Sequence, residues 1–187
     1  MPEIYEIRIH ARAGQGAKSA AHLIAEAAFK SGKYVQAFPS YGPERMGAPM
    51  NVYVRISDVP LRRHSNIIAA DLAIVIDASL LSDPAVTSAL RPGGQIIVNS
   101  SLPAAALLSR INTTCRLLTV AASEISREIF GKDLPNTAMI AAANQATGFV
   151  PKESLHAAVA EFFTNKYNQS IGEKNITAMV RAEEGFK

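Results

Sequence analysis

The chain has 187 residues, of which 48% are hydrophobic and 19% are charged. This balance is typical of a folded globular protein, and the length predicts a single domain over residues 1–187. The 19 Lys and Arg residues outnumber the 16 Asp and Glu residues by only three, without any long basic run, which argues against a nucleic-acid-binding protein.

Cys115 is the only cysteine. A lone cysteine excludes an internal disulfide, an iron–sulfur cluster held by this chain alone and a cysteine-rich zinc site. The four histidines are scattered without the spacing of metal ligands. No apolar run approaches the roughly 18 residues of a membrane span, and charges near the N-terminus argue against a signal peptide. We therefore expect a cytoplasmic protein with no metal and no membrane segment.

The first part of the chain alternates strand-like and helix-like segments. Residues 5–10 alternate between apolar and polar, which predicts a strand. The sequence G-Q-G at 14–16 interrupts this pattern, and 17–31 has the apolar stripe of an amphipathic helix. Strands are predicted at 34–38 and 50–57 with no helix between them. Parallel neighbours need a crossover of a dozen or more residues, so we expect antiparallel pairing here.

The rest of the chain continues this alternation and then becomes helical. Strands are predicted at 72–77, 95–98 and 116–120, with a turn at 92–94. Helices are predicted at 84–90, 102–110, 123–130, 137–147, 152–165 and 173–183. The fold class is therefore α/β, a three-layer α/β/α sandwich with a mixed, mostly parallel sheet and a helical C-terminal third.

Two of the predicted strands, 5–10 and 50–57, each have one polar face. Both faces of an α/β sheet are normally covered. Either these strands lie at an edge of the sheet, or their polar side meets another protein.

The segment from His10 to Lys18 leads from the end of a strand into the start of a helix. In α/β proteins this is where phosphates bind, because free N–H groups point outward there. Glycines at 14 and 16 allow close approach of a ligand, and Arg12 and Lys18 add charge. G-Q-G lacks the third glycine of a dinucleotide fingerprint and the end of a P-loop. The alternative interpretation is a tight turn that binds no ligand. His10 is expected at the surface.

A second loop, residues 39–49, contains three prolines and two glycines. Proline restricts the unfolded chain, so a loop of this kind can be long and still ordered. It presents Tyr41, Glu44, Arg45 and Met46, a mixture typical of interface contacts. We expect a partner interface here, with a solvated connector as the alternative.

Together the two loops resemble a known family. The G-Q-G turn, the stretch G-K-Y-V-Q-A-F-P-S-Y-G-P-E-R-M-G-A-P at 32–49, D-L-A-I-V-I-D at 71–77 and R-P-G-G-Q-I-I-V-N-S at 91–100 are similar to the gamma subunit of 2-oxoacid:ferredoxin oxidoreductases. The resemblance covers essentially the whole chain. The family loop usually has a glycine where this sequence has Ala13.

This resemblance implies one subunit of an enzyme complex that oxidatively decarboxylates pyruvate to acetyl-CoA and reduces ferredoxin. The fold would be that of domain III of the single-chain enzymes (PFOR), whose glycine-rich loop contacts coenzyme A. Thiamine diphosphate and the iron–sulfur clusters would belong to alpha, beta and delta partner subunits. This chain would hold no cofactor by itself and carry no catalytic residue, and would be inactive alone. The residues expected to face the phosphates of coenzyme A are Arg12, Gly14, Gln15, Gly16 and Lys18.

The choice of 2-oxoacid rests on one position. Related 2-oxoglutarate and branched-chain enzymes tend to have a glycine pair where this chain has Gly47 and Ala48, which favours pyruvate. The alternatives are a gamma subunit for 2-oxoglutarate, branched-chain 2-oxoacids or indolepyruvate, a purely structural assembly module, and an independent Rossmann-type enzyme. A homodimer formed by the isolated chain is a further alternative.

Overall fold

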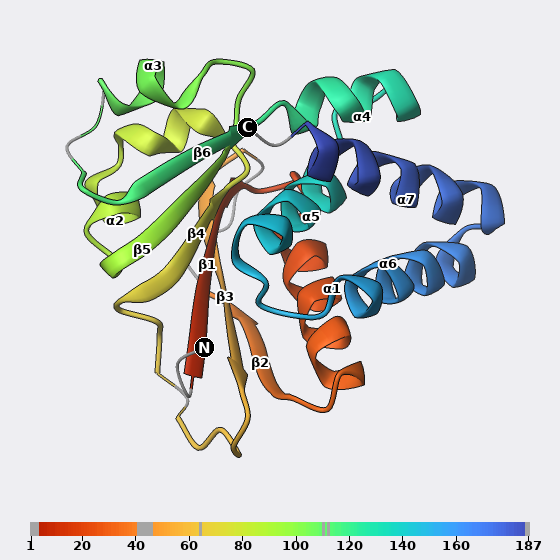
Figure 1. The fold of residues 1–187 in the computed structure, drawn as a ribbon, viewed down its shortest axis with the longest axis horizontal. Coiled ribbons are helices and arrows are strands. Elements are labelled where there is room, and N and C mark those ends of the chain that lie inside the picture. The colour runs from red at the N-terminus through yellow and green to blue at the C-terminus, as the bar shows by residue number, and fades with distance from the viewer. Residues whose placement is uncertain (1–3, 41–46, 64, 110, 112, 186–187) are drawn as a thin grey trace.

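The computed structural model describes residues 4–40, 47–63, 65–109, 111 and 113–185, and its centre is one six-stranded sheet (Figure 1). The strand order is β2-β3-β1-β4-β5-β6. The strands are β1 (Ile4–Arg12), β2 (Tyr34–Pro39), β3 (Pro49–Ser57), β4 (Ala70–Val75), β5 (Leu90–Asn99) and β6 (Arg116–Val120). β3 runs antiparallel to both of its neighbours, whereas β1, β4, β5 and β6 pair in parallel. The mixed, mostly parallel sheet is confirmed.

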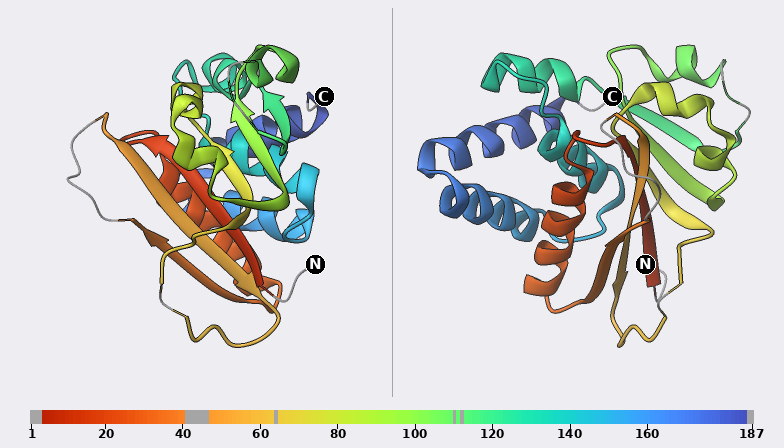
Figure 2. Two further views of the ribbon diagram at one scale, coloured as in Figure 1. Left: turned by 90° about the vertical axis from the view of Figure 1, so that its left-hand side faces the viewer. Right: turned by 180° about the vertical axis from the view of Figure 1, so that it is seen from behind.

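Helices cover both faces of this sheet, which confirms the three-layer arrangement (Figures 1 and 2). One face carries α1 (Ala17–Lys30), α4 (Ala122–Phe130), α5 (Asn136–Thr147), α6 (Lys152–Lys166) and α7 (Gln169–Glu184). On the other face, the helices among the described residues are short: the 3-10 helix η1 (Ala78–Ser82), α2 (Pro84–Thr87) and α3 (Ala104–Leu108). No helix in the described part of the chain is long and apolar enough to cross a membrane.

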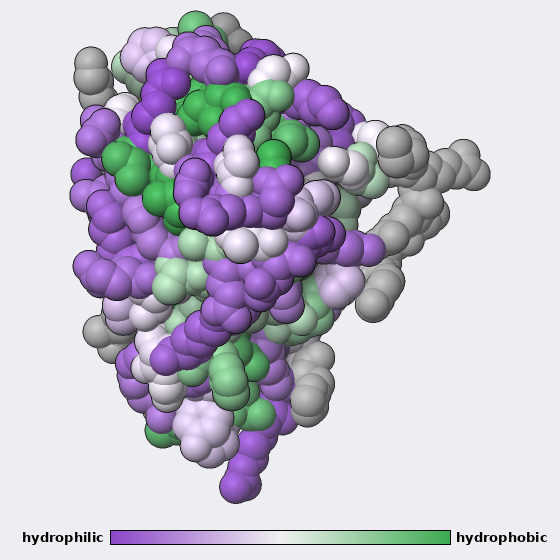
Figure 3. All heavy atoms as spheres, turned by 90° about the vertical axis from the view of Figure 1, so that its right-hand side faces the viewer, coloured by the Kyte–Doolittle hydropathy of each residue, from purple (hydrophilic) through white to green (hydrophobic). Residues whose placement is uncertain are grey.

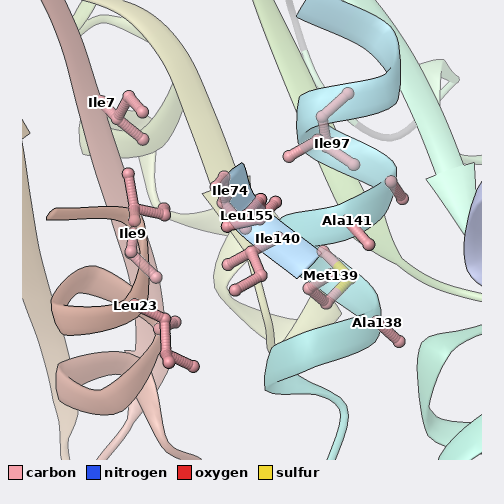
Figure 4. Close-up of a cluster of buried hydrophobic side chains, with 14 of the residues drawn as sticks. Ile7, Ile9, Leu23, Ile74, Ile97, Ala138, Met139, Ile140, Ala141 and Leu155 are labelled. Atoms are coloured by element: carbon pink, nitrogen blue, oxygen red, sulfur yellow. The ribbon is translucent and has the colours of Figure 1, made fainter. Parts of the chain in front are cut away.

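The main core lies between the sheet and the five longer helices. Ile7 and Ile9 of β1 point toward this layer, together with Leu23 of α1 (Figure 4). Residues 137–144 of α5 are all buried, as expected for a helix enclosed on every side. Four of these eight are alanines, and their small side chains let α5 pack closely in the layer. α1 and α5 are thus packed firmly in this core, and their first residues lie beside the G-Q-G turn.

The polar face of β1 and β3 is buried, and the expectation that these strands lie at an edge is wrong. Glu6 and Arg55 are opposite each other in the β1–β3 register, and Arg55 Nε lies 2.7 Å from Glu6 Oε1. Arg91 Nη2 of β5 contacts the other carboxylate oxygen of Glu6 at 2.6 Å. Ile67, from the segment before β4, packs on Tyr53 of β3. Glu6 and Arg55 are therefore paired inside the chain, whereas Arg8 Nε and His10 Nε2 of the same face are buried without a hydrogen-bond partner among the described residues.

Several element boundaries differ from the sequence prediction; the helix predicted at 84–90 ends at Thr87, and Leu90 already begins β5. Residues 92–94, predicted as a turn, belong to β5, where the pairing with β4 shifts register around the left-handed Gly93 (φ 81°). This irregularity is a bulge that keeps the strand continuous. α7 begins at Gln169, four residues before the predicted start, because the Asn168 side chain accepts a hydrogen bond from the backbone N–H of Ile171 and caps the helix.

Candidate functional site

The G-Q-G turn lies at the point where the connections that follow the two neighbouring strands β1 and β4 leave the sheet on opposite faces. After β1 the chain enters α1 on one face, and after the neighbouring parallel strand β4 it enters η1 on the other face. Such a switch point opens a crevice at the carboxyl ends of the strands, where ligands of α/β proteins bind. Residues 12–16 and 77–79 line this switch point.

The backbone of the turn explains its glycines. Gly14 and Gly16 have φ values of 101° and 81°, a region that favours glycine. No non-glycine among the described residues has a positive φ, so Ala13 fits the turn without strain. The N–H of Ala13 donates to the carbonyl of Ala48 at 2.9 Å, which ties the turn to the residue before β3. The alanine at position 13 is therefore compatible with an ordered loop.

Arg12 and Gln15 are held by a carboxylate at the end of β4. Arg12 Nε lies 3.2 Å from Asp77 Oδ2, and Gln15 Nε2 donates to the same oxygen at 2.9 Å. The Gln15 side-chain oxygen accepts from the backbone N–H of Arg12 at 2.7 Å. The remaining Arg12 nitrogens donate to Ser79 Oγ and to the carbonyl of Gly47. Both side chains fix the shape of the turn.

Asp77 is ionised at neutral pH and is the centre of this network. Partial burial would raise its pKa, but hydrogen bonds from Ser79 and Gln15 and the Arg12 charge outweigh it. The pKa of Asp77 is therefore lowered from its ordinary value. The Ser79 hydroxyl donates to Asp77 Oδ1 at 2.6 Å and the Ser79 backbone N–H at 3.0 Å.

A cleft of about 430 Å³ opens beside the turn. Its described lining residues are Gly14, Gln15, Gly16, Ser19, Phe130, Lys132, Leu134, Asn136, Phe162, Phe163, Lys166, Tyr167, Ile171 and Asn175. Of the sequence-predicted residues, Gly14, Gln15 and Gly16 line it, whereas Arg12 and Lys18 do not. Two other lysines, Lys132 and Lys166, supply its positive charge. The sequence prediction missed both, since they follow α4 and end α6, far along the chain from the turn.

Two helices begin at this cleft without a capping side chain. Gly16 is the N-cap of α1 and Pro135 that of α5, and neither helix has a side-chain cap. Asn136 lies against Gly16: a Cβ atom at position 16 would stand 3.0 Å from Asn136 Nδ2. Uncapped helix starts leave N–H groups available to an acceptor, and the helix dipoles favour an anion.

His10 lies outside the cleft, and its predicted surface position is wrong. The side chain points to the sheet face opposite α1 and is only 4% exposed. Burial, reinforced by the nearby charge of Arg8, lowers the pKa of His10 to about 4, so the imidazole is neutral at neutral pH. It belongs with the buried polar face of β1.

The remaining predicted residues concern the second loop. Tyr41, Glu44, Arg45 and Met46 lie outside the described residues. In the ranges that the structure covers, no group of three His, Cys, Asp or Glu residues could hold a metal ion. Cys115 is partly buried and packs against the core on the η1 side of the sheet.

Comparison with known proteins matches the whole chain. The family model for pyruvate ferredoxin/flavodoxin oxidoreductase matches residues 6–184. The common subunit gamma of the pyruvate/ketoisovalerate oxidoreductases of Thermococcus kodakarensis is 44% identical over 182 residues, which cover 97% of this chain and 95% of that protein. The crystal structure of pyruvate oxidoreductase subunit PORC from Thermotoga maritima has a TM-score of 0.88 and 36% identity, and the match covers 99% of this chain and 98% of that chain.

A more distant likeness concerns part of a larger chain. A 2-oxoglutarate:ferredoxin oxidoreductase from Magnetococcus marinus, solved with 2-oxoglutarate, coenzyme A and succinyl-CoA bound, matches 98% of this chain and 31% of its own, with a TM-score of 0.80. At 16% identity it shows the shared fold alone. The family model, by contrast, spans residues 6–184, nearly the whole chain, and the Thermococcus relative is 44% identical over almost its full length. The chain belongs to the pyruvate ferredoxin/flavodoxin oxidoreductase family.

Proposed function

We propose that this chain is the gamma subunit of a multi-subunit pyruvate (2-oxoacid):ferredoxin oxidoreductase. The observation that carries the proposal is the 44% identity to a separate gamma subunit over 97% of this chain and 95% of that one. The match thus spans nearly the full length of that gamma subunit. Thiamine diphosphate and iron–sulfur clusters belong to alpha, beta and delta partners, and ferredoxin accepts the electrons through the complex.

The described residues support a subunit that carries no reaction centre of its own. The described lining of the cleft includes no cysteine or histidine, and its polar residues are amides, a serine, a tyrosine and two lysines. These groups bind and orient a ligand, whereas thiamine chemistry needs the cofactor itself. The role of the chain is therefore to dock on the thiamine-binding subunits, by way of Tyr41, Glu44, Arg45 and Met46, and to contact coenzyme A.

Coenzyme A contact is proposed for the G-Q-G turn. Gly14, Gln15 and Gly16 line the cleft and uncapped helices begin there, which suits an anionic ligand. Arg12 acts indirectly, because its guanidinium is bound to Asp77, Ser79 and Gly47. Lys18 lies in the first turn of α1 and strengthens the positive field of that helix end.

Selection of the 2-oxoacid is assigned to the partner subunits. The Thermococcus relative is named as a gamma subunit common to the pyruvate and ketoisovalerate oxidoreductases, so in that organism one gamma chain serves two substrates. In this chain Ala48 engages the turn through its backbone carbonyl, which a glycine would also provide. Pyruvate is the proposed substrate, with branched-chain 2-oxoacids as the second.

Copurification from the native cell tests the subunit assignment. The tagged chain should carry with it a thiamine diphosphate protein and iron–sulfur proteins, and the eluate should reduce ferredoxin only when both pyruvate and coenzyme A are present. The chain purified alone should be colourless and inactive with pyruvate. Turnover by the isolated chain, or capture without any thiamine protein, would contradict the assignment. Alanine at Tyr41, Glu44, Arg45 and Met46 together should abolish capture while leaving the circular dichroism spectrum unchanged.

A further inference from the structure

The sheet face opposite α1 carries a buried positive charge that no described residue neutralises. Arg8 of β1 is only 7% exposed, and among the described residues it forms no hydrogen bond and no ion pair. Its guanidinium carbon lies 5.6 Å from the centre of the Tyr53 ring, which is a contact with an aromatic face and not with an anion. Arginine stays protonated in proteins, so this charge cannot be removed by loss of a proton.

The other charges on this face balance one another without Arg8. Glu6, two residues earlier on β1, is bound by Arg55 and Arg91, and Arg91 Nη1 also lies 3.0 Å from Asp71 Oδ2. Two carboxylates and two guanidinium groups therefore form a neutral network. Arg8 is an additional buried cation beside it, and an unpaired buried charge is strongly unfavourable unless an anion reaches it.

His10 presents a second unpartnered polar atom on the same face of β1. The side chain is 4% exposed, and its Nε2 atom is buried without a hydrogen-bond partner among the described residues. His10 and Arg8 are two positions apart on a strand, which puts their Cα atoms about 7 Å apart with both side chains on one face. A neutral imidazole can carry its hydrogen on Nε2 and donate it to an acceptor.

The two side chains lie between separate hydrophobic clusters. Arg8 is opposite Tyr53 of β3 and Ala73 of β4, and His10 is opposite Val75 of β4. Ala73 and Val75 belong to the cluster under η1 and α2, whereas Tyr53 belongs to a different one. The left view of Figure 2 looks onto this face, and Figure 3 shows the opposite side, where the long helices lie under a mostly hydrophilic surface. Arg8 and His10 are thus a polar strip with apolar packing on either side.

The charges of the strip favour a ligand with a single negative charge. Arg8 supplies one full charge, and His10 is neutral at neutral pH. The negative charge of Asp83 is close enough to raise the pKa of His10, so it would repel a dianion such as phosphate. A guanidinium group donates two parallel hydrogen bonds to a planar carboxylate. A monocarboxylate therefore fits the pair better than a phosphate group.

We infer that Arg8 and His10 form a binding site for one carboxylate group, which accepts hydrogen bonds from the guanidinium of Arg8 and from Nε2 of His10. The carboxylate belongs to a small organic acid or to an Asp or Glu side chain of a protein bound to this chain. Neither residue lines the cleft beside the G-Q-G turn. The inference goes beyond the proposed function and does not depend on it.

Titration of the full chain with sodium acetate, which replaces sodium chloride at constant ionic strength, tests the site directly. With isotope-labelled arginine, the Nε–H resonance of Arg8 is identified by its loss in Arg8→Met. It should shift and saturate with a Kd of about 1–10 mM, the range expected for two or three charge-assisted hydrogen bonds. A shift that does not saturate, or the absence of a shift, overturns the inference.

Thermal unfolding measures the same binding in variants. Acetate at about 100 mM should raise the Tm of the parent by about 4–7 °C over equal chloride, because the ligand binds only the folded chain. Arg8→Met should show no rise, and Arg8→Lys a smaller one, because an ammonium group lacks the planar fork. Arg116→Met, at an exposed arginine on β6, is the matched control and should keep the full rise. An equal rise in the parent and in both Arg8 variants overturns the inference.

The assembled complex distinguishes the two sources of the carboxylate. If a partner protein supplies it, acetate should promote dissociation, and the complex with Arg8→Met should dissociate at lower salt than the complex with Arg116→Met. If a small acid supplies it, the two complexes should dissociate at the same salt concentration, and acetate should raise the Tm of the parent complex. Acetate that changes neither the isolated chain nor the complex overturns the inference.

Discussion

Asp77 is the residue that organises the G-Q-G turn. One of its carboxylate oxygens faces Arg12 and Gln15, and the other faces the hydroxyl and backbone N–H of Ser79. A neutral amide in this place has only one oxygen, so it cannot accept from both sides. The carboxylate therefore links β4 to the turn that follows β1, and it holds the turn in the shape that lines the cleft.

Asp77→Asn should loosen the turn without unfolding the protein. Hydrogen bonds to a charged acceptor contribute about 1.5–3 kcal/mol each, less where solvent reaches them, so we expect a loss of about 1–2 kcal/mol in stability. Amide hydrogen exchange at residues 13–16 should accelerate by about tenfold. Asp58→Asn, which removes a single exposed partner of Lys33, is the control and should leave that exchange unchanged. Equal protection of the turn in both variants would contradict the role of Asp77.

At the scale of elements, the start of α1 depends on a glycine for two separate reasons. Gly16 has a φ of 81°, and a Cβ atom there would meet Asn136 of α5 at 3.0 Å. Gly32, which follows the same helix, has a similar φ of 79° but nothing within 4 Å of such an atom. Substitutions at the two glycines can therefore be compared. Their difference in unfolding free energy separates backbone strain from the close contact between α1 and α5.

Gly32→Ala should destabilise the protein by about 1–2 kcal/mol through backbone strain alone. Gly16→Ala should cost more, because the added methyl group also forces Asn136 to move. Urea unfolding of the two variants measures the difference. Combining Gly16→Ala with Asn136→Ala should recover part of the excess, since it removes the two nearest atoms. Equal costs at both glycines would show that the contact with α5 contributes nothing.

Most elements could be predicted because their periodicity is local. The alternation in 5–10 and 50–57 corresponds to β1 and β3, and the apolar stripe of 17–31 corresponds to α1. The position of β1 inside the sheet could not be predicted in this way. Alternation separates two faces, but Glu6 and Arg55 look alike in sequence whether they face water or each other. Only the register between two distant strands distinguishes the cases.

The sequence could predict the candidate site only where one continuous segment of the chain forms it. Glycines between a strand and a helix indicate the turn at 14–16, and the structure puts that turn in the cleft. The charges of the cleft come from Lys132 and Lys166, which lie more than a hundred residues further along the chain, and no local pattern distinguishes them from other surface lysines. Conversely, Arg12 is a plausible phosphate ligand by sequence until its pairing with Asp77 is seen.

At the scale of the whole molecule, His10 makes global stability sensitive to acid. Its folded pKa of about 4 lies below the ordinary value of 6.5, so folding favours the neutral imidazole. This contribution is complete above about pH 6.5 and is lost as the pH falls from there toward 4. Between pH 7 and pH 5 the loss from this one group should be about 2 kcal/mol.

The prediction is checked by urea unfolding of the parent and of His10→Asn at the two pH values. The variant is expected to be less stable at pH 7 but to lose about 2 kcal/mol less on going to pH 5. His22→Gln, at an exposed position on α1, is the control and should keep the pH dependence of the parent. The same pH dependence in His10→Asn as in the parent would contradict the role of this histidine.

The central place of β1 has a consequence for synthesis on the ribosome. β1 is the first strand to emerge, but its neighbours β3 and β4 are complete only at residue 75, and α5, which joins α1 in the helical layer on this face of the sheet, is made later still. Until then α1, made directly after β1, is the helix available to cover Ile7 and Ile9. Chains terminated before α5 expose this sheet face and are prone to aggregate. The G-Q-G turn and Lys166 can meet at one cleft only in a chain that extends through α6.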